Sequence, residues 1–462
     1  MSANTTEKHL LILCTTTGYQ TQAFVEAAHK LGLAVVLGTD RCHVLKDPWQ
    51  DGALALRFED AEKCAKQIVD FSRQTPLSAV LALGDRPTAA AAQACQALGL
   101  PYHPTEAVEA CRDKYQLRER LRAGGLRVPA FRRYLCTADP RELIASAPGF
   151  PCVLKPLSLS GSRGVIRADN AEQFVAAFDR IRNLLRSPEV QVLGEEASQF
   201  IQVEAYIEGQ EVAVEAVVDR GQLKVLAIFD KPDPLQGPYF EETIYVTPSR
   251  LPREVQTVVT DTLAQAVRVL GLFHGPLHAE FRLNCRGERR PVPTGSRDSP
   301  QAERHSGLHP QKPVADGSPP GVWVLEIAAR SIGGLCSRAL RFCSPTLGEG
   351  FSLEELLIHL ASGENVHDVR RESAASGVMM VPIPRAGIYE GAEGVEAASR
   401  TPGVEDIEIT AKPGQRLVPL PEGSSYLGFI FARGTLPHSV EAALRTAHEK
   451  LHFGIRPALP VV

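Results

Sequence analysis

The sequence predicts a chain of mixed α/β and α+β class, divided into three regions. Short aliphatic runs alternate with helical stretches over the first hundred residues, whereas strands and helices mix without this alternation in the centre. The alternation resumes towards the end of the chain and closes with a helix over 440–451. Because 462 residues suit about three domains of ordinary size, we expect domains over 1–104, 105–372 and 373–462.

Composition and charge exclude several classes of protein. Hydrophobic residues make up 44% and charged residues 23% of the chain, as in folded soluble domains, which excludes disordered and fibrous proteins. The 50 basic and 54 acidic residues give a net charge of −4, too balanced for a nucleic-acid binder that relies on counterion release. No apolar run approaches the roughly 18 residues that cross a bilayer. We therefore expect small-molecule partners, with no nucleic acid and no membrane.

Cysteine usage indicates a reducing compartment. The ten cysteines are scattered along the chain without a C-x-x-C pair. They are expected to be reduced and to pack inside a cytoplasmic protein. The same scatter argues against a zinc site.

The first region predicts a doubly wound α/β domain. Its aliphatic strands are continuous, which is typical of a parallel sheet with helices on both faces. The turn after the first strand, Thr15 to Gly18, lacks the G-x-G-x-x-G pattern of a dinucleotide site. We expect strands over 10–14, 34–37 and 79–83 and helices over 20–31, 59–71 and 87–98.

A basic helix is predicted over 105–124, and a phosphate-binding element follows it. The strand over 153–156 contains Lys155, and a loop rich in Gly and Ser follows directly, over 158–165. Backbone N–H groups of such a loop can approach phosphate oxygens, and the lysine supplies a positive charge. The alternative is an ordinary flexible turn with a solvated lysine.

Carboxylates gather around a bend over 202–215. A strand, a turn at Gly209 and a second strand bring Glu204 and Glu211 close to that bend. The backbone over 205–207 could offer an adenine its N–H and C=O groups, with a carboxylate on the ribose hydroxyls. The alternative is an ordinary hairpin whose acidic side chains face water.

Two further acids lie on strands that we expect to be neighbours. Glu280 lies in the strand over 277–283 and Glu326 in the strand over 322–327, and alternation can point both to one side. Paired carboxylates of this kind are a common magnesium seat. Four residues after the second acid, Arg330 suits a carboxylate or an acyl phosphate, which it can grip with two hydrogen bonds.

The segment over 285–321 stands apart, with seven prolines and hardly any aliphatic residues. It separates the two acidic strands, and its composition predicts a disordered hairpin insertion.

Taken in order, these stretches resemble the ATP-grasp superfamily over nearly the whole chain. The run from Arg112 to Pro129 is also part of that pattern. The resemblance implies a central two-lobed ATP-grasp domain over 105–372 that binds ATP with one or two Mg²⁺ ions, for which Mn²⁺ could substitute. It implies catalytic roles for Lys155 and Arg330. It assigns phosphate contacts to Lys114, Lys155, Ser160, Gly161 and Ser162, nucleoside contacts to Glu204, Ala205, Ile207 and Glu211, and metal binding to Glu280 and Glu326.

Within the superfamily the chain looks most like the L-amino acid ligases of the bacilysin synthetase type. Many members carry an asparagine two residues after the second metal acid, where this chain has Ala328, and the L-amino acid ligases vary there. The pattern over 384–430 also resembles their C-terminal α+β domain, which acts as a lid. A homodimer is common among such relatives and is expected here.

The resemblance implies a carboxylate–amine ligase that forms ADP. A γ-phosphoryl group moved to a carboxylate gives an acyl phosphate, which an amine then attacks. One alternative is a carboxylase or a purine-biosynthesis type of ligase that uses bicarbonate, formate or a phosphoribosylamine. The other is an ATP-binding module without catalytic activity.

Overall fold

The computed structural model describes residues 9–15, 20–40, 53–192, 194–284 and 321–458. The N-terminal region forms a parallel sheet in the order β3-β2-β1-β4. Its strands are β1 (His9–Cys14), β2 (Ala34–Thr39), β3 (Leu54–Ala55) and β4 (Leu77–Leu83). The three predicted strands are present in a parallel sheet, as predicted, and the short β3 is an addition.

Helices cover both faces of this sheet, as a doubly wound domain requires. They are α1 (Thr21–Lys30), α2 (Ala61–Ser72), α3 (Thr88–Leu98) and α10 (Leu353–Ala361). Alternate residues of β1 point to opposite faces, so Leu11 packs in a core with α2 and α3, and Leu10 in a core with α1. The helix α10, from much later in the chain, joins the core of Leu10. The N-terminal sheet is therefore completed by a helix that follows the predicted site residues in the sequence.

The single helix predicted over 105–124 is two helices, so that prediction is wrong. They are α4 (Thr105–Arg112) and α5 (Lys114–Ala123). Asp113, with an extended backbone, separates them and accepts hydrogen bonds from the N–H groups of Tyr115 and Gln116. A carboxylate at this position satisfies amides that the start of a helix leaves without partners. The break places Lys114 in the first turn of α5.

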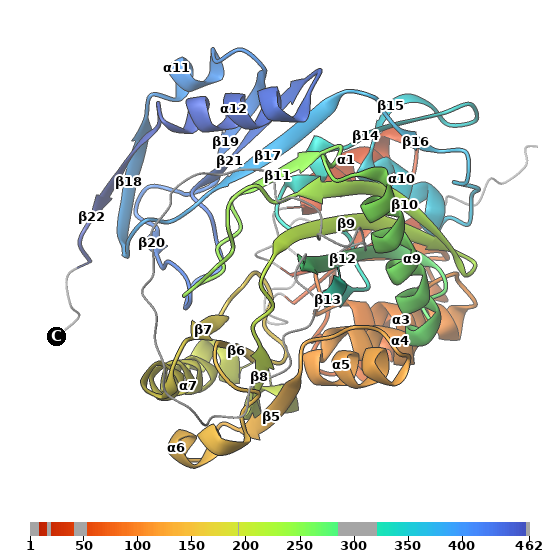
Figure 1. Cartoon of the computed structure of the whole chain (residues 1–462). Helices are drawn as coiled ribbons and strands as arrows, with labels where there is room; N and C mark the ends of the chain where they lie inside the picture. The colour runs from red at the N-terminus through yellow and green to blue at the C-terminus, as the bar shows by residue number, and fades with distance from the viewer. Residues whose placement is uncertain (1–8, 16–19, 41–52, 193, 285–320, 459–462) are drawn as a thin grey trace, which may run out of the picture.

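An antiparallel sheet in the order β5-β8-β6-β7 forms a lobe of its own, below the main sheet in Figure 1. Its strands are β5 (Phe131–Leu135), β6 (Cys152–Pro156), β7 (Ile166–Ala168) and β8 (Phe200–Ala205), and its helices are α6 (Pro140–Leu143), α7 (Ala171–Leu185) and α8 (Pro188–Gln191). Phe174 and Phe178 of α7 are fully buried against this sheet. The strand predicted to contain Lys155 is β6, which lies between β8 and β7 in the sheet of the lobe.

An eight-stranded sheet in the order β13-β12-β9-β10-β11-β17-β21-β19 forms the main body (Figure 1). Its strands are β9 (Gln210–Asp219), β10 (Gln222–Asp230), β11 (Ile244–Thr247), β12 (Gly275–Asn284), β13 (Gly321–Ala328), β17 (Ala375–Val381), β19 (Val404–Ile409) and β21 (Gly428–Gly434). Helix α9 (Arg253–Leu270) packs on it through Leu263 and Val267. Because β9 belongs to this sheet and β8 to the lobe, residues 206–209 join two sheets, and the ordinary hairpin considered for 202–215 is absent.

In the C-terminal region, β17, β19 and β21 extend the same sheet. Helix α12 (Pro437–His448), the predicted terminal helix, packs against them. The remaining elements are β14 (Arg341–Ser344), β15 (Gly348–Ser352), β16 (Arg370–Arg371), β18 (Gly387–Glu393), β20 (Arg416–Leu417), β22 (His452–Arg456) and α11 (Val395–Ser399). The insertion predicted over 285–321 lies outside the described residues, apart from Gly321 at its end.

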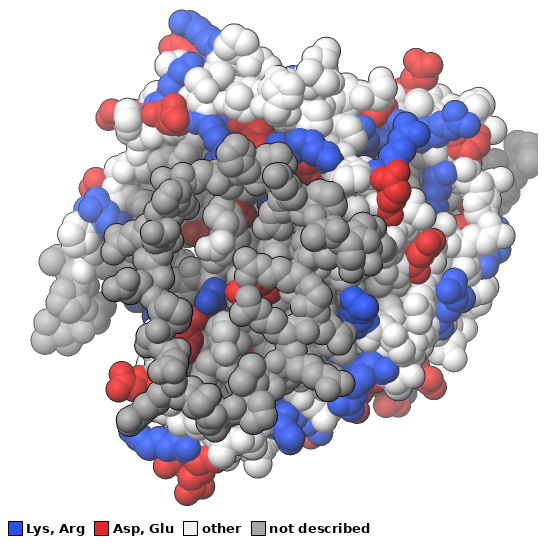
Figure 2. Space-filling view, in the orientation of Figure 1, with Lys and Arg blue, Asp and Glu red and all other residues white. Residues whose placement is uncertain are grey.

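Acidic and basic side chains are interspersed around the described surface in Figure 2, in keeping with the near balance of total charge. Among the helices of the described ranges, none has the length and apolar character that crossing a bilayer requires.

Candidate active site

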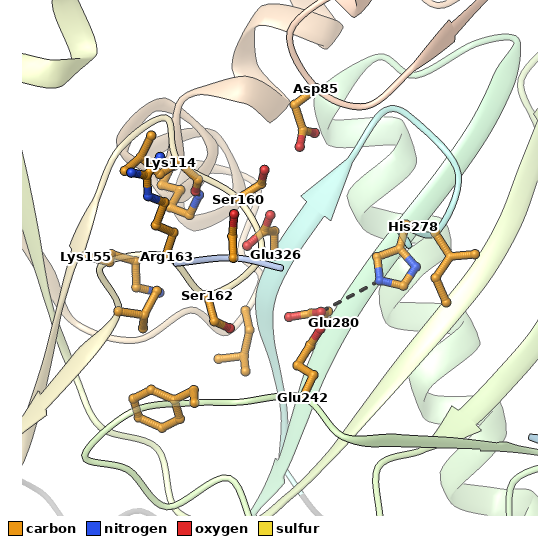
Figure 3. A pocket seen from close by; sticks show the side chains of 18 of the residues that line it. Asp85, Lys114, Lys155, Ser160, Ser162, Arg163, Glu242, His278, Glu280 and Glu326 are labelled. Carbon is orange, nitrogen blue, oxygen red and sulfur yellow. Dashed lines mark hydrogen bonds and ion pairs between the residues drawn. The ribbon is translucent and has the colours of Figure 1, made fainter. Parts of the chain in front are cut away.

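All the predicted site residues line one cleft of about 460 Å³ between the lobe, the eight-stranded sheet and the N-terminal domain. Figure 3 shows Lys114 and Lys155 on one side of it and Glu280 and Glu326 across from them. The twelve residues are Lys114, Lys155, Ser160, Gly161, Ser162, Glu204, Ala205, Ile207, Glu211, Glu280, Glu326 and Arg330. Segments spread over more than two hundred positions of the sequence thus meet at one site.

Lys155 is held in place by a buried carboxylate. Its Nζ lies 2.6 Å from Glu204, whose other oxygen lies 2.8 Å from the Nε of Arg118. Gln202 donates a further hydrogen bond to Glu204 at 2.7 Å. Burial alone would raise the pKa of Glu204, but the Arg118 and Lys155 charges outweigh it and hold the pKa at about 2. Glu204 therefore orients the lysine, and each of its oxygens contacts a cation.

The Glu204 pKa predicts an acid-dependent loss of stability. A folded-state pKa of about 2, against an ordinary 4.5, means that the carboxylate stabilises the fold above about pH 4.5 and that this contribution fades as the pH falls towards 2. The shift corresponds to roughly 3 kcal/mol. We expect the parent and a Glu204→Gln variant to differ most in melting temperature at pH 5 and least near pH 2. A difference that stays constant over this range would contradict the assignment.

The Gly/Ser loop is fastened at both ends. Near the start of the loop, Lys114 donates from Nζ to the carbonyl oxygen of Leu159 at 2.8 Å. The first residue of α5 therefore holds this end of the loop. At the far end, the N–H of Gly164 donates to the carbonyl of Pro421 at 2.7 Å, and a Cβ there would lie 2.7 Å from Pro156. Glycine is required at 164 by this approach and by its positive φ of 74°. Ser160, Gly161 and Ser162, which line the cleft, therefore belong to a loop that is supported at both ends.

The segment proposed to hold adenine has one backbone donor to spare. The N–H groups of Ala205 and Tyr206 already donate to the carbonyls of Ala130 and Pro151. The N–H of Ile207 has no partner within the described ranges. Of the residues predicted for adenine, Ile207 therefore offers the available hydrogen-bond donor.

Three carboxylates surround a lysine that sequence reasoning missed. Lys231, just after β10, contacts Glu211 at 2.8 Å, Glu280 at 3.0 Å and also Glu242. Glu211 accepts a further hydrogen bond from Arg282 at 2.5 Å. Burial alone would lower the pKa of Lys231, but the three carboxylates raise it above its usual value. These acids have oxygens within 4.8 Å of one another, a spacing that suits a divalent cation.

The two predicted metal acids are direct neighbours. Glu280 of β12 and Glu326 of β13 are paired in the antiparallel register, as expected from their alternation. Glu326 has no hydrogen-bond or ion-pair partner in the part of the chain that the structure describes, so its oxygens are available. Two positions along the same register, His278 is paired with Ala328. Ala328 offers no side-chain oxygen, and the imidazole of His278 lies beside Glu280 instead, at 3.7 Å.

Two further residues that line the cleft, Arg330 and His278, are each paired with a carboxylate. Arg330 forms two hydrogen bonds with Asp85, at 2.9 and 3.1 Å. His278 Nδ1 lies 3.1 Å from buried Glu215. Sequence patterns could have identified two more residues of this site. Asp85 follows the carboxyl end of a parallel strand, where ligands of α/β sheets bind, and Lys231 follows a buried strand. No local sequence pattern marks Arg118.

Three family models match separate parts of the chain. The ATP-grasp N-terminal domain matches residues 25–102, the ATP-grasp domain 148–297 and the L-amino acid ligase C-terminal domain 2 residues 379–456. The chain belongs to the ATP-grasp superfamily. The C-terminal match is to the L-amino acid ligase type, which confirms the resemblance drawn from the sequence.

Individual relatives agree with this placement. The ATP-grasp chain is 25% identical over 456 residues to the uncharacterized protein y4rH of Sinorhizobium fredii, covering 97% of this chain and 83% of that protein. It is 27% identical over 271 residues to alanine–anticapsin ligase of Bacillus subtilis, covering 55% of this chain and only 56% of that ligase. The crystal structure of an L-amino acid ligase from Bacillus licheniformis superposes with a TM-score of 0.76 at 24% identity, over 98% of this chain and 99% of that one. This last likeness shows the shared ATP-grasp fold.

Proposed function

We propose that this protein is an ATP-dependent carboxylate–amine ligase that activates a carboxylate, in the simplest case that of an amino acid, as an acyl phosphate. The observation that carries the proposal is the meeting of twelve predicted residues in one cleft, with Lys114 and Lys155 across from Glu280 and Glu326. The match to the L-amino acid ligase C-terminal domain and to alanine–anticapsin ligase supports an amino-acid substrate.

ATP is proposed to lie between the lobe and the eight-stranded sheet. The N–H of Ile207 would donate to adenine, and Glu211 would accept from the ribose through the lone pairs that Lys231 and Arg282 leave free. Lys114, Lys155 and the N–H groups over 160–162 would offset the phosphate charge. These contacts place the γ-phosphate towards the acidic strands.

The donor set fits a hard divalent cation. Glu280 and Glu326 are paired in the register of neighbouring strands and would supply carboxylate oxygens, and oxygen is the ligand that Mg²⁺ and Mn²⁺ prefer. A bound Mg²⁺ would neutralise charge on the phosphates during transfer. Ala328 leaves the site without the amide oxygen that many superfamily members supply, so we propose that water fills that position.

The proposed chemistry has two steps. A carboxylate oxygen of the substrate attacks the γ-phosphorus, and the bond to the β-γ bridging oxygen breaks, which gives ADP and an acyl phosphate. The amine then attacks the acyl carbon, phosphate departs with the bonding electrons, and the amine nitrogen loses a proton. Lys155 and Arg330 stabilise the negative charge that moves during these steps. Closure of the loop over 158–164 excludes water, which would otherwise hydrolyse the acyl phosphate.

The test is release of ADP and phosphate with Mg-ATP across single and paired amino acids, with bicarbonate and formate alongside. Stimulation by amino acids without AMP is the expected result. Stimulation by bicarbonate or formate alone would favour the carboxylase or purine-type ligase, and AMP with pyrophosphate would contradict acyl-phosphate chemistry.

In the same assay, Glu326→Gln is expected to lose at least tenfold in turnover. Equal turnover in parent and variant would indicate an ATP-binding module without catalytic activity.

We further propose that the protein works in the cytoplasm on small molecules. The described cysteines are all unpaired, and seven of the eight are buried: they are Cys14, Cys64, Cys95, Cys111, Cys136, Cys152, Cys336 and Cys343, of which the last is the partly exposed one. Free thiols in this number are typical of a reducing compartment.

A further inference from the structure

Asp85 and Arg330 form an ion pair that connects two domains inside the cleft. Asp85 follows β4 of the N-terminal sheet, and Arg330 lies two residues beyond β13 of the eight-stranded sheet. Their side chains are 24% and 12% exposed, and both line the cleft. The pair is therefore well shielded from water but in contact with the space that a substrate would occupy.

The geometry of this pair leaves a specific part of the guanidinium free. Nε donates to one Asp85 oxygen at 2.9 Å and Nη2 to the other at 3.1 Å, while Nη1 donates to the carbonyl of Ser331 at 2.9 Å. A guanidinium has five N–H hydrogens, and these contacts use three. Within the described residues, one hydrogen on each terminal nitrogen is left. These two hydrogens, the free fork of Arg330, can be donated to oxygens of a carboxylate or phosphoryl group.

The backbone that carries Arg330 is also held from both domains. The N–H of Ile332 donates to the buried Glu215 carboxylate of β9, at 3.1 and 3.2 Å to its two oxygens. The side-chain amide of Gln20, in the N-terminal domain, donates to the Ile332 carbonyl. With the backbone fixed in this way, the direction of the guanidinium depends mainly on the contact with Asp85.

We propose that Asp85 is a positioning residue, which holds Arg330 so that its free fork faces the acyl group during phosphoryl transfer and amine attack. The inference rests on the proposed ligase function and adds a role for the N-terminal domain in the chemistry. An arginine without this partner could rotate about its side-chain bonds. Misplacement by about 1 Å at a reacting group can cost on the order of 10²-fold in rate.

Asp85→Asn tests the proposal, because it keeps the shape of the side chain but replaces a charged acceptor by an amide that can present a donor to the guanidinium. We expect kcat for ATP turnover with amino acids to fall by about 10–100-fold. The dissociation constant for ADP should change by less than about twofold, because Asp85 belongs to the N-terminal domain, whereas Ile207 belongs to the segment that joins the lobe to the eight-stranded sheet. The matched control is Asp40→Asn, which affects an ion pair with Arg86 at the same edge of the same sheet, within one domain.

A double-mutant cycle separates positioning from other roles. If Asp85 acts through Arg330, Asp85→Asn should lower kcat by less than about threefold in an Arg330→Lys background. An equal loss in both backgrounds would overturn the inference. A parallel loss of ADP binding and melting temperature would also overturn it, since that would indicate a structural role. If the parent protein shows no turnover with any amino acid, the proposed function fails first and the inference with it.

Discussion

Replacing Lys231 with methionine is expected to destabilise the fold by about 3–5 kcal/mol, because breaking a buried ion pair leaves uncompensated charge. Lys231 is 3% exposed at its side chain and contacts Glu211, Glu242 and Glu280, which are 8–19% exposed. Without the ammonium group, three carboxylates would face one another, with Arg282 left on Glu211 and His278 left beside Glu280. At roughly 2–4 °C per kcal/mol, the melting temperature should fall by about 6–20 °C.

The same variant should respond to divalent cations. Because the three carboxylates already have oxygens within 4.8 Å of one another, Mn²⁺ at millimolar concentration is expected to restore part of the lost melting temperature by binding the folded state. Lys224→Met is the matched control, since Lys224 donates to a backbone carbonyl rather than to an acid. A Lys231→Met protein that melts within about 2 °C of the parent would contradict this account of the cluster.

Replacing Glu280 with glutamine is expected to reduce ATP turnover by about 10²–10³-fold. Metal-assisted charge stabilisation contributes several kcal/mol, and each 1.36 kcal/mol corresponds to a factor of ten in rate. Glutamine keeps the size of the side chain and can still accept a hydrogen bond from Lys231, so the fold should persist. The negative charge that would bind a divalent cation is lost. The measurements are ADP release as a function of Mg²⁺ concentration and the melting temperature of the variant.

The control for this variant is Glu390→Gln, which changes a strand carboxylate of the same type that is 54% exposed and distant from the cleft lining. Its turnover should match that of the parent. Full activity of Glu280→Gln at saturating Mg²⁺ would exclude Glu280 as a metal ligand and shift attention to Glu326.

Local pattern was enough to predict the strands that carry the site. Buried strands such as β6 and β12 are marked by their apolar runs, and Lys155 and Glu280 lie within those runs. The register that pairs Glu280 with Glu326 follows from alternation. The break at Asp113 was less visible, because a helix-compatible sequence continues on both sides of it.

Long-range partners could not be read from the sequence. Arg118 contacts Glu204 across 86 positions of the chain, and Arg330 contacts Asp85 across 245. The sequence around each of these residues does not distinguish a side chain in a buried ion pair from a solvated one. The pairing depends on how the lobe, the N-terminal sheet and the main sheet pack together. Sequence reasoning therefore identified residues that line one cleft and missed Arg118 and Asp85, which pair with two of them.

The continuous eight-stranded sheet joins the C-terminal strands and the acidic strands in one frame. Residues over 244–247 pair with residues over 376–379, so the C-terminal strands are fixed to the acidic strands by a backbone ladder. The lobe shares no sheet with this frame. Hydrogen bonds hold it to the C-terminal region instead: the N–H of Gly164 donates to the Pro421 carbonyl, Arg163 donates to the Glu422 carbonyl, and Arg180 donates to the Glu422 carboxylate. Any separation of the lobe from the C-terminal region would have to break these contacts together, so no single one of them controls the width of the cleft.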